Sequence, residues 1–220
     1  LGAQVLLQPA IEIGPPADWA PVDRVLPKLA EFQWIVFSSS NGVQYFLDRL
    51  LDQHLDARAF AAAKLAAIGP GTAAALRRYA LSADLVPQEF RAEGLAAALA
   101  PHVQGQRVLL IRASRGREVL AEELRRAGAH VEQVVAYSST DVTAPDPDIA
   151  EKLDDGRIDF VAATSSAIAR SLVRIFGDSL RQSQLVSISP ITSETLRELG
   201  HTPVNEALTY TCLLYTSDAA

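Results

Sequence analysis

The fold is decided by WIVFSSSNGVQYFLDRL at residues 34–50 and by its near-repeat, DFVAATSSAIARSLVRIFG, at residues 159–177. Each segment begins with an apolar run, passes through a cluster of hydroxyl side chains and ends in an amphipathic helical pattern. A second pair follows in the same order, KLAAIGPGTAAALRRYAL at 64–81 and QLVSISPITSETLRELG at 184–200. Because two landmarks recur in order at similar separations, the sequence predicts two copies of one structural unit.

Short apolar runs alternate with Ala- and Leu-rich helical patterns along the chain, which is typical of βαβ units and parallel sheets. The expected strands are 5–8, 34–38, 65–68, 84–86, 107–111, 131–137, 159–163, 185–188 and 203–205. The expected helices are 42–51, 72–80, 92–100, 117–127, 167–176 and 192–199. The predicted class is therefore α/β, with two similar parallel-sheet domains of the flavodoxin-like or Rossmann-like kind.

A third pair of segments is incomplete, and the two ends of the chain are unusual. GAQVLLQP at 2–9 is similar to GAHVEQVVAY at 128–137, but only the second copy follows a strand and a helix, at 107–127. The repeat therefore predicts about 25 further residues, one strand and one helix, before Leu1. The last residues, CLLYTSDAA at 212–220, resemble a translated sequencing adapter, and we expect them to be a non-native tail.

Composition narrows the class of protein. The 220 residues carry a net charge of −6, with 49% hydrophobic and 21% charged side chains, which excludes a disordered chain. An acidic chain is a poor candidate for nucleic-acid or anionic-membrane binding, which needs clustered Lys and Arg. No apolar run approaches the ~20 residues that cross a bilayer. The single cysteine, Cys212, cannot form an internal disulfide, so we expect a cytoplasmic protein.

Four turns are candidates for binding an anion. IGPGT at 68–72 and ISPIT at 188–192 each follow an expected strand and open an expected helix, as do SSSNG at 38–42 and TSSA at 164–167. Free N–H groups at helix N-termini bind anions without basic side chains, at the sheet edge where ligands collect in α/β folds. Each hydroxyl residue could instead be an ordinary helix cap.

Tyr137 and Arg112 are candidates at strand ends. Tyr137 ends the strand VEQVVAY, and a phenol can act as a weak general acid; the alternative is a half-buried strand aromatic. Arg112 ends the strand RVLLIR, and a guanidinium at that place can form two parallel hydrogen bonds to a carboxylate. The alternative for Arg112 is a solvated loop cluster with Arg115 and Arg117.

Other chemistries have weaker signals. The stretch 69–74 matches the dinucleotide fingerprint G-x-G-x-x-A, with Asp84 and Glu89 as ribose candidates. The repeated turn has Ser189 and Ile191 at the glycine positions, which counts against a nucleotide site. The sequence has no metal-binding motif, P-loop or serine-hydrolase elbow, and we expect no metal site.

Eight short motifs carry a family resemblance. In order they are GAQVLLQP, FSSSNGV, IGPGTA, PQEFRAEGL, RASRGREVL, GAHVEQVVAY, ATSSA and ISPIT. With them the chain resembles the uroporphyrinogen-III synthase family over most of residues 1–211. The resemblance implies two α/β domains with a cleft between them, one formed by about 1–10 with 143–211 and an inserted one formed by about 11–142.

The resemblance also implies an activity, the cyclisation of hydroxymethylbilane to uroporphyrinogen III with loss of water and inversion of the last pyrrole ring. It implies a monomeric hydro-lyase without cofactor or metal, in which Tyr137 assists departure of hydroxide. The implied substrate-binding residues are Ser38, Ser39, Asn41, Gly69, Thr72, Arg112, Ser165, Ser166, Ile191 and Thr192. Two alternatives stay open: a non-catalytic tetrapyrrole-binding or ligand-binding module, and a nucleotide-dependent enzyme.

Overall fold

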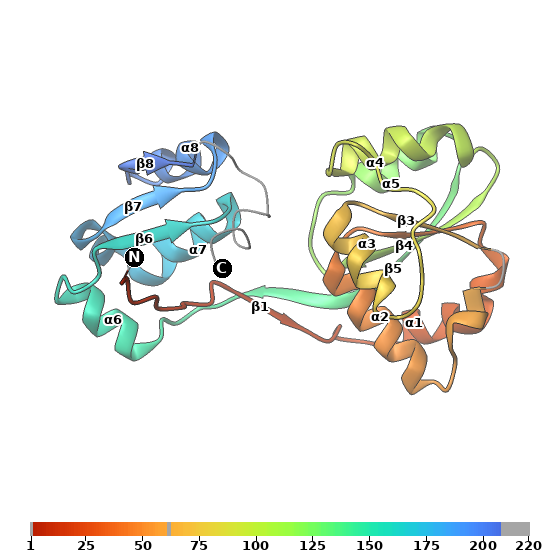
Figure 1. Cartoon of the computed structure of the whole chain (residues 1–220), viewed down its shortest axis with the longest axis horizontal. Helices are drawn as coiled ribbons and strands as arrows, with labels where there is room; N and C mark the ends of the chain where they lie inside the picture. Colours follow the sequence, from red (N-terminus) through yellow and green to blue (C-terminus); the bar gives the residue numbers. More distant parts are fainter. Residues whose placement is uncertain (1, 61–62, 208–220) are drawn as a thin grey trace. The chain divides into compact units, whose positions relative to one another are not determined.

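The chain forms two compact units, each of the α/β class that the sequence predicts (Figure 1). The computed structural model describes residues 2–60 and 63–207. Unit 1 is the chain up to Glu12 together with the chain from Thr140 onward, and unit 2 is Ile13–Ser139. The tail expected at 212–220 lies outside the described residues.

A five-stranded sheet, most of whose residues belong to unit 2, has the strand order β1-β5-β4-β2-β3. The strands are β1 (Ile11–Gly14), β2 (Trp34–Phe37), β3 (Lys64–Ala67), β4 (Arg107–Ala113) and β5 (His130–Asp141). β2 pairs in parallel with β3 and β4, and β4 pairs in parallel with β5. At the carboxyl end of β2, Phe37 lies beside Ala67 and Ile111.

Helices cover both faces of this sheet, as a parallel sheet requires. They are α1 (Ala20–Val25), α2 (Ser40–Asp52), α3 (Pro70–Arg77), α4 (Ala92–Leu99) and α5 (Val119–Arg126), with short 3-10 turns at Leu26–Glu31, Ala57–Phe60 and Ala100–His102. Ile35 and Phe37 pack with α1, α2 and α3 on one face, and Trp34 and Val36 pack with α4 and α5 on the other. Figure 1 shows the α4–α5 pair on the side of the sheet opposite α1 and α2.

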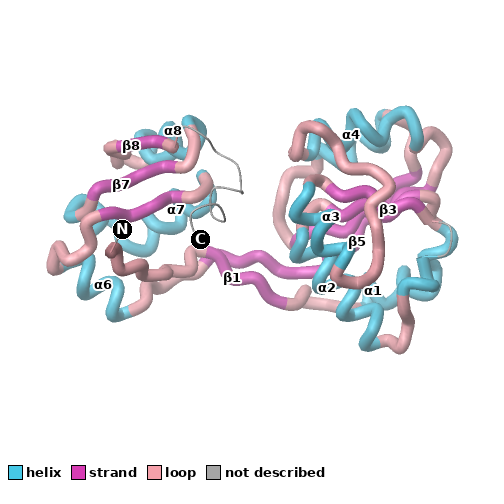
Figure 2. Tube along the Cα trace, in the orientation of Figure 1, coloured by secondary structure: helices cyan, strands magenta, loops and turns pink. Residues whose placement is uncertain are grey.

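Unit 1 has a three-stranded parallel sheet in the order β6-β7-β8 (Figure 2). Its strands are β6 (Phe160–Ala163), β7 (Gln184–Ser187) and β8 (Asn205–Glu206). Its helices are α6 (Pro147–Asp154), α7 (Ser166–Phe176) and α8 (Pro190–Glu198), with a 3-10 turn at Gly177–Gln182. Ala163 and Leu185 pack with residues of all three helices in one apolar core.

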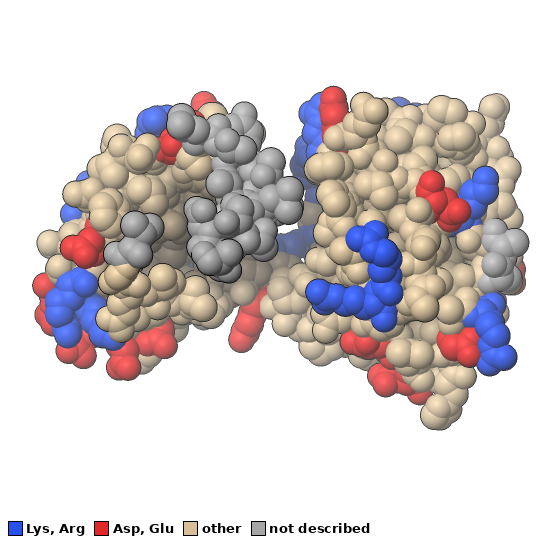
Figure 3. Space-filling model, viewed as in Figure 1, with Lys and Arg blue, Asp and Glu red and all other residues tan. Residues whose placement is uncertain are grey.

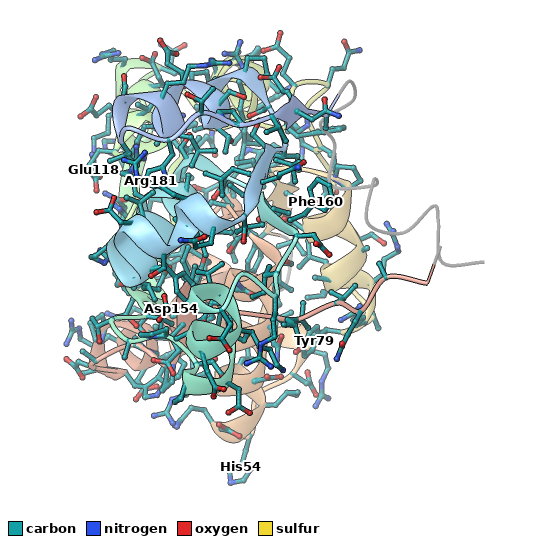
Figure 4. The ribbon with its side chains drawn as sticks, turned by 90° about the vertical axis from the view of Figure 1, so that its left-hand side faces the viewer. His54, Tyr79, Glu118, Asp154, Phe160 and Arg181 are labelled. Carbon is teal, nitrogen blue, oxygen red and sulfur yellow. The ribbon has the colours of Figure 1, made fainter. Side chains whose placement is uncertain are left out.

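The repeat predicted from sequence is visible strand by strand. β2 and β6 occupy the same place in the two copies, and so do β3 and β7. The two copies differ on one face: Trp34 and Val36 are buried under α4 and α5, whereas Phe160, labelled in Figure 4, is 60% exposed and Ala162 is also exposed.

Several expected elements differ from the structure. Residues 5–8 do not form a strand: Val5 and Leu7 are 76% and 82% exposed, and no described strand pairs with them. Ile11–Gly14 forms β1 instead. The strand expected at 84–86 is reduced to one bridge between Ala66 and Leu85, because Pro87 ends it. Among the described residues, no helix is both long enough and apolar enough to span a membrane.

Candidate active site

Within the described residues, four helices start directly after the carboxyl end of a parallel strand, two in each unit. In unit 2, α2 follows β2 and α3 follows β3; in unit 1, α7 follows β6 and α8 follows β7. The residue before each helix is extended, and the first N–H groups of each helix have no acceptor within the helix itself. These N-cap residues are Ser39, Gly69, Ser165 and Ser189.

Three of the four helices are capped by their own serine. Ser39 Oγ accepts from the Gly42 N–H at 2.9 Å, and Ser165 Oγ accepts from the Ile168 N–H at 3.2 Å. Ser189 Oγ accepts from the Thr192 N–H at 3.4 Å. The N-cap of α3 is Gly69, which has no side chain to do this. The capping interpretation therefore holds for the three serines, and α3 keeps the most available donors.

Ser39 also contacts the candidate acid. Ser39 Oγ donates to Tyr137 Oη at 2.9 Å, and the ring of Tyr137 stacks on that of Tyr45 with centroids 6.0 Å apart. Tyr137 is 7% exposed. Gly42 makes room for this group, because a Cβ at that position would lie 3.2 Å from Ser39 Oγ and 3.8 Å from Tyr137 Cε1. The hydroxyl of Tyr137 thus accepts a hydrogen bond and keeps its own proton to donate.

Of two other candidates of unit 2, one is engaged within the protein. Ser38 Oγ donates to the Ile111 carbonyl at 3.0 Å, which ties β2 to β4. Asn41 is half-buried in the first turn of α2.

Arg112 is held by its own loop. It is 16% exposed, donates to the Ala113 and Gly116 carbonyls, and contacts Gln133 and Glu118. Its hydrogen bond to Glu118 lowers the pKa of that carboxyl. The guanidinium therefore braces the loop after β4, and it has few N–H groups left for a substrate carboxylate.

The turns of unit 1 combine a buried and an exposed residue. Thr192 is 1% exposed and its Oγ1 lies 3.1 Å from Ser189 Oγ. Ile191, in contrast, is 71% exposed, and its carbonyl accepts from Ser166 Oγ at 3.4 Å. This last contact joins the two turns, 25 residues apart in sequence, at one edge of the β6-β7-β8 sheet.

A model of one protein family, described as uroporphyrinogen-III synthase HemD, matches residues 1–212. This chain belongs to the uroporphyrinogen-III synthase family. It is 32% identical over 96% of its length to a uroporphyrinogen-III synthase of Synechococcus elongatus, of which it covers 83%. It is 28% identical over 90% of its length to that of Chlorobaculum parvum, of which it covers 81%.

Solved structures of the uroporphyrinogen-III synthase family share the fold. The uroporphyrinogen-III synthetase of Helicobacter pylori superposes with a TM-score of 0.63 at 18% identity, over 92% of this chain and 86% of that one. A mutant uroporphyrinogen III synthase of Thermus thermophilus superposes with a TM-score of 0.61 at 19% identity, over 92% and 82%. The family resemblance and the α/β class expected from sequence are therefore confirmed.

Sequence reasoning about this family member missed two aromatic residues in unit 2. Tyr45, which stacks on Tyr137, falls on α2 of the repeat and carries no separate signal. Phe90 stands beside the α3 turn and is 60% exposed. Sequence patterns place apolar residues in the core, so they do not predict that an apolar residue lies at the surface.

The nucleotide alternative finds no support in unit 2 of this family member. Asp84 Oδ2 accepts from the Leu65 N–H at 2.7 Å, so the carboxylate that would bind a ribose holds β3 instead. Among residues 2–60 and 63–207 no cluster of three or more His, Cys, Asp or Glu side chains could hold a metal ion.

Proposed function

We propose that this protein is a uroporphyrinogen-III synthase, a lyase that closes hydroxymethylbilane with loss of water and inversion of the last ring. The observation that carries the proposal is the pairing of Ser39 with Tyr137 at the carboxyl edge of the sheet. It supplies one buried, oriented proton donor among turns rich in N–H groups. Membership of the family supports the same reaction.

Tyr137 serves as the proton donor in the first step. Electron density from the pyrrole nitrogen expels the terminal hydroxyl of the substrate, the carbon–oxygen bond breaks, and the Tyr137 proton joins the departing hydroxide to make water. The azafulvenium cation that remains is attacked by the substituted carbon of the last ring to give a spiro intermediate. The bond from that carbon to its original methylene bridge then breaks, and the second azafulvenium cation so formed is attacked by the unsubstituted α-carbon of the same ring. The proton lost when the new pyrrole regains aromaticity returns to the Tyr137 oxygen, which balances the cycle.

The hydrogen bonds around Tyr137 suit this role. Ser39 accepts the Gly42 N–H and donates to Tyr137, so a backbone dipole and a hydroxyl both stabilise negative charge on the phenol oxygen as the proton leaves. The stacked ring of Tyr45 fixes the direction of the phenol. Positioning is the larger task, because the enzyme must favour one of two carbons of the same ring.

The substrate's eight carboxylates call for several anion sites. A protein with a net charge of −6 can bind them where helix N-termini supply local positive potential. On the face drawn in Figure 3, acidic and basic side chains are interspersed between larger uncharged areas. Each unit presents its own pair of turns; Asn41, Gly69 and Thr72 lie at those of unit 2, and Ser165, Ser166, Ile191 and Thr192 at those of unit 1. We propose that these turns bind carboxylates, and that the protein acts as a cytoplasmic monomer without cofactor.

Separation of the product isomers tests this function. The protein is incubated with freshly prepared hydroxymethylbilane, with heat-inactivated protein as the control. We expect uroporphyrinogen III from the active protein and isomer I, the product of uncatalysed closure, from the control. Isomer I alone in both samples, or tight binding of the tetrapyrrole without turnover, contradicts the proposal and favours a binding module.

A further inference from the structure

An exposed phenylalanine stands against the first turn of α3. Phe90 is 60% exposed. A Cβ added at Gly69, the N-cap of α3, would lie 3.3 Å from Phe90 Cβ and 3.4 Å from its Cγ. The backbone of Gly69 is extended (φ −170°, ψ 178°), a conformation open to any residue. A side chain at residue 69 would therefore crowd Phe90, which would have to shift.

The loop that carries Phe90 is held in place. The Arg91 N–H donates to the Glu89 carbonyl at 2.8 Å. A Cβ added at Gly94 would lie 2.3 Å from that same carbonyl oxygen, so α4 can lie against the loop only because residue 94 is glycine. Pro87, just before the loop, is buried. Phe90 therefore presents its ring to solvent directly beside the N-cap of α3.

The first turn of α3 has donors without partners. Pro70 has no N–H, and the N–H groups of Gly71 and Thr72 donate to no acceptor among the described residues. Thr72 is 5% exposed, and its hydroxyl makes no hydrogen bond within residues 2–60 and 63–207. That hydroxyl reaches solvent, because no fully buried side-chain oxygen of the described residues lacks a partner.

The equivalent turn before α8 has a side-chain cap that α3 lacks. There Ser189 caps α8, and Thr192 Oγ1 lies 3.1 Å from Ser189 Oγ. In α3 a glycine replaces that serine, so the equivalent hydroxyl of Thr72 and one N–H lose their internal partner. Phe90 lies where the serine side chain would stand. The ring of Phe90 thus stands in place of a serine cap. The N–H groups of Gly71 and Thr72 and the Thr72 hydroxyl remain without an internal acceptor beside it.

We propose that Phe90 and the first turn of α3 form a subsite for one pyrrole ring of the substrate together with its carboxylate arm. The ring stacks on Phe90 in an offset arrangement. The carboxylate accepts from the Gly71 and Thr72 N–H groups and from the Thr72 hydroxyl. The subsite rests on the proposed function for the identity of the substrate, and it assigns to Phe90 a role in ring placement.

Kinetics of paired variants test the aromatic part. Phe90→Leu removes the aromatic face, and we expect KM to rise roughly threefold to tenfold, as for the loss of one stacking contact, with kcat unchanged. Phe90→Tyr keeps the face and should restore KM. Gly69→Ser, which copies the turn of α8, should raise KM further by capping the helix and displacing Phe90. An unchanged KM in Phe90→Leu overturns the subsite.

NMR with a small probe separates this proposal from the proposed function. The probe is a pyrrole bearing one propanoate arm, and its control is cyclopentane with the same arm. We expect both to shift the amide signals of Gly71 and Thr72, and only the pyrrole to show upfield ring-proton shifts that disappear in Phe90→Leu. Binding without any synthase activity would reject the function and keep the subsite. Activity with no shift at Gly71 and Thr72 would reject the subsite alone.

Discussion

Ser39 Oγ lies 2.9 Å from Tyr137 Oη, joining two residues 98 positions apart in the chain. The same oxygen accepts the Gly42 N–H, which starts the hydrogen bonding of α2. One serine therefore does two things: it caps a helix and it fixes the direction of a phenol. Because of this hydrogen bond, the serine that caps α2 also belongs to the candidate active site.

Replacing Tyr137 by Phe removes the proposed proton donor and keeps the buried ring. We expect kcat to fall about 100-fold, at the low end of what general acids contribute, because the substrate also loses water unaided. The thermal midpoint should change little, since only one hydrogen bond of about 1 kcal/mol is lost.

A second Tyr→Phe change in unit 2 is a matched control. Tyr79 donates to Asp48 at 2.7 Å, and burial and this hydrogen bond raise the pKa of Tyr79 to about 12. Tyr79→Phe should leave kcat unchanged. If Tyr137→Phe matched this control, Tyr137 would be a structural residue only.

The buried serine pair of unit 1 predicts a non-additive stability effect. Ser193 contacts Ser187 and Glu206 through its hydroxyl, while the equivalent residues of unit 2 are Ala67 and Ala73. Ser193→Ala alone should cost about 1–3 kcal/mol in urea unfolding, because the buried Ser187 hydroxyl loses its partner. The double change Ser187→Ala with Ser193→Ala should recover most of this. A double variant as unstable as the sum of both singles would contradict the account.

The ion pair between Asp23 and Arg49 predicts a pH dependence of stability. Arg49 binds Asp23 with two hydrogen bonds of 2.8 and 2.7 Å, and the side-chain bond lowers the pKa of Asp23 below its ordinary value of 3.8. A carboxyl whose folded pKa is depressed contributes stability above its unfolded pKa and loses it as the pH falls through the folded value. Asp23→Asn should therefore lower the thermal midpoint at neutral pH, and the difference from wild type should close below about pH 4.

The exposed pair Asp56–Arg58 provides the comparison, because Arg58 is 92% exposed and such surface pairs contribute little. Asp56→Asn should have a smaller effect at neutral pH. A difference for Asp23→Asn that stays constant from neutral to acid pH would show that the charge of Asp23 does not act through Arg49.

The repeat made most of the fold readable from sequence. Periodicity located β2, β3, β4, β6 and β7 and the helices after them, since buried strands and amphipathic helices leave local patterns. Residues 5–8 show the limit of this reasoning. Their apolar run predicts a strand, but a strand needs a neighbour to pair with, and no described strand pairs with this run.

The candidate site was readable only in part. The hydroxyl turns were visible because they repeat, and the serine caps follow from local chemistry. The contact between Ser39 and Tyr137 depends on the order of strands in the sheet, which places β5 two positions from β2. The loop of Phe90 lies close to Gly69 and Gly94, and no single-sequence pattern reveals these close approaches.

A double-mutant cycle on kcat tests most directly whether Ser39 and Tyr137 work as one unit. Ser39→Ala, Tyr137→Phe and the double variant are compared with wild type, with Ser39→Thr as the variant that retains a hydroxyl. The account predicts that both single changes slow turnover and that the double variant is no slower than Tyr137→Phe, because Ser39 acts through the phenol. Fully multiplicative losses, or a Ser39→Ala variant with wild-type kcat, would contradict it.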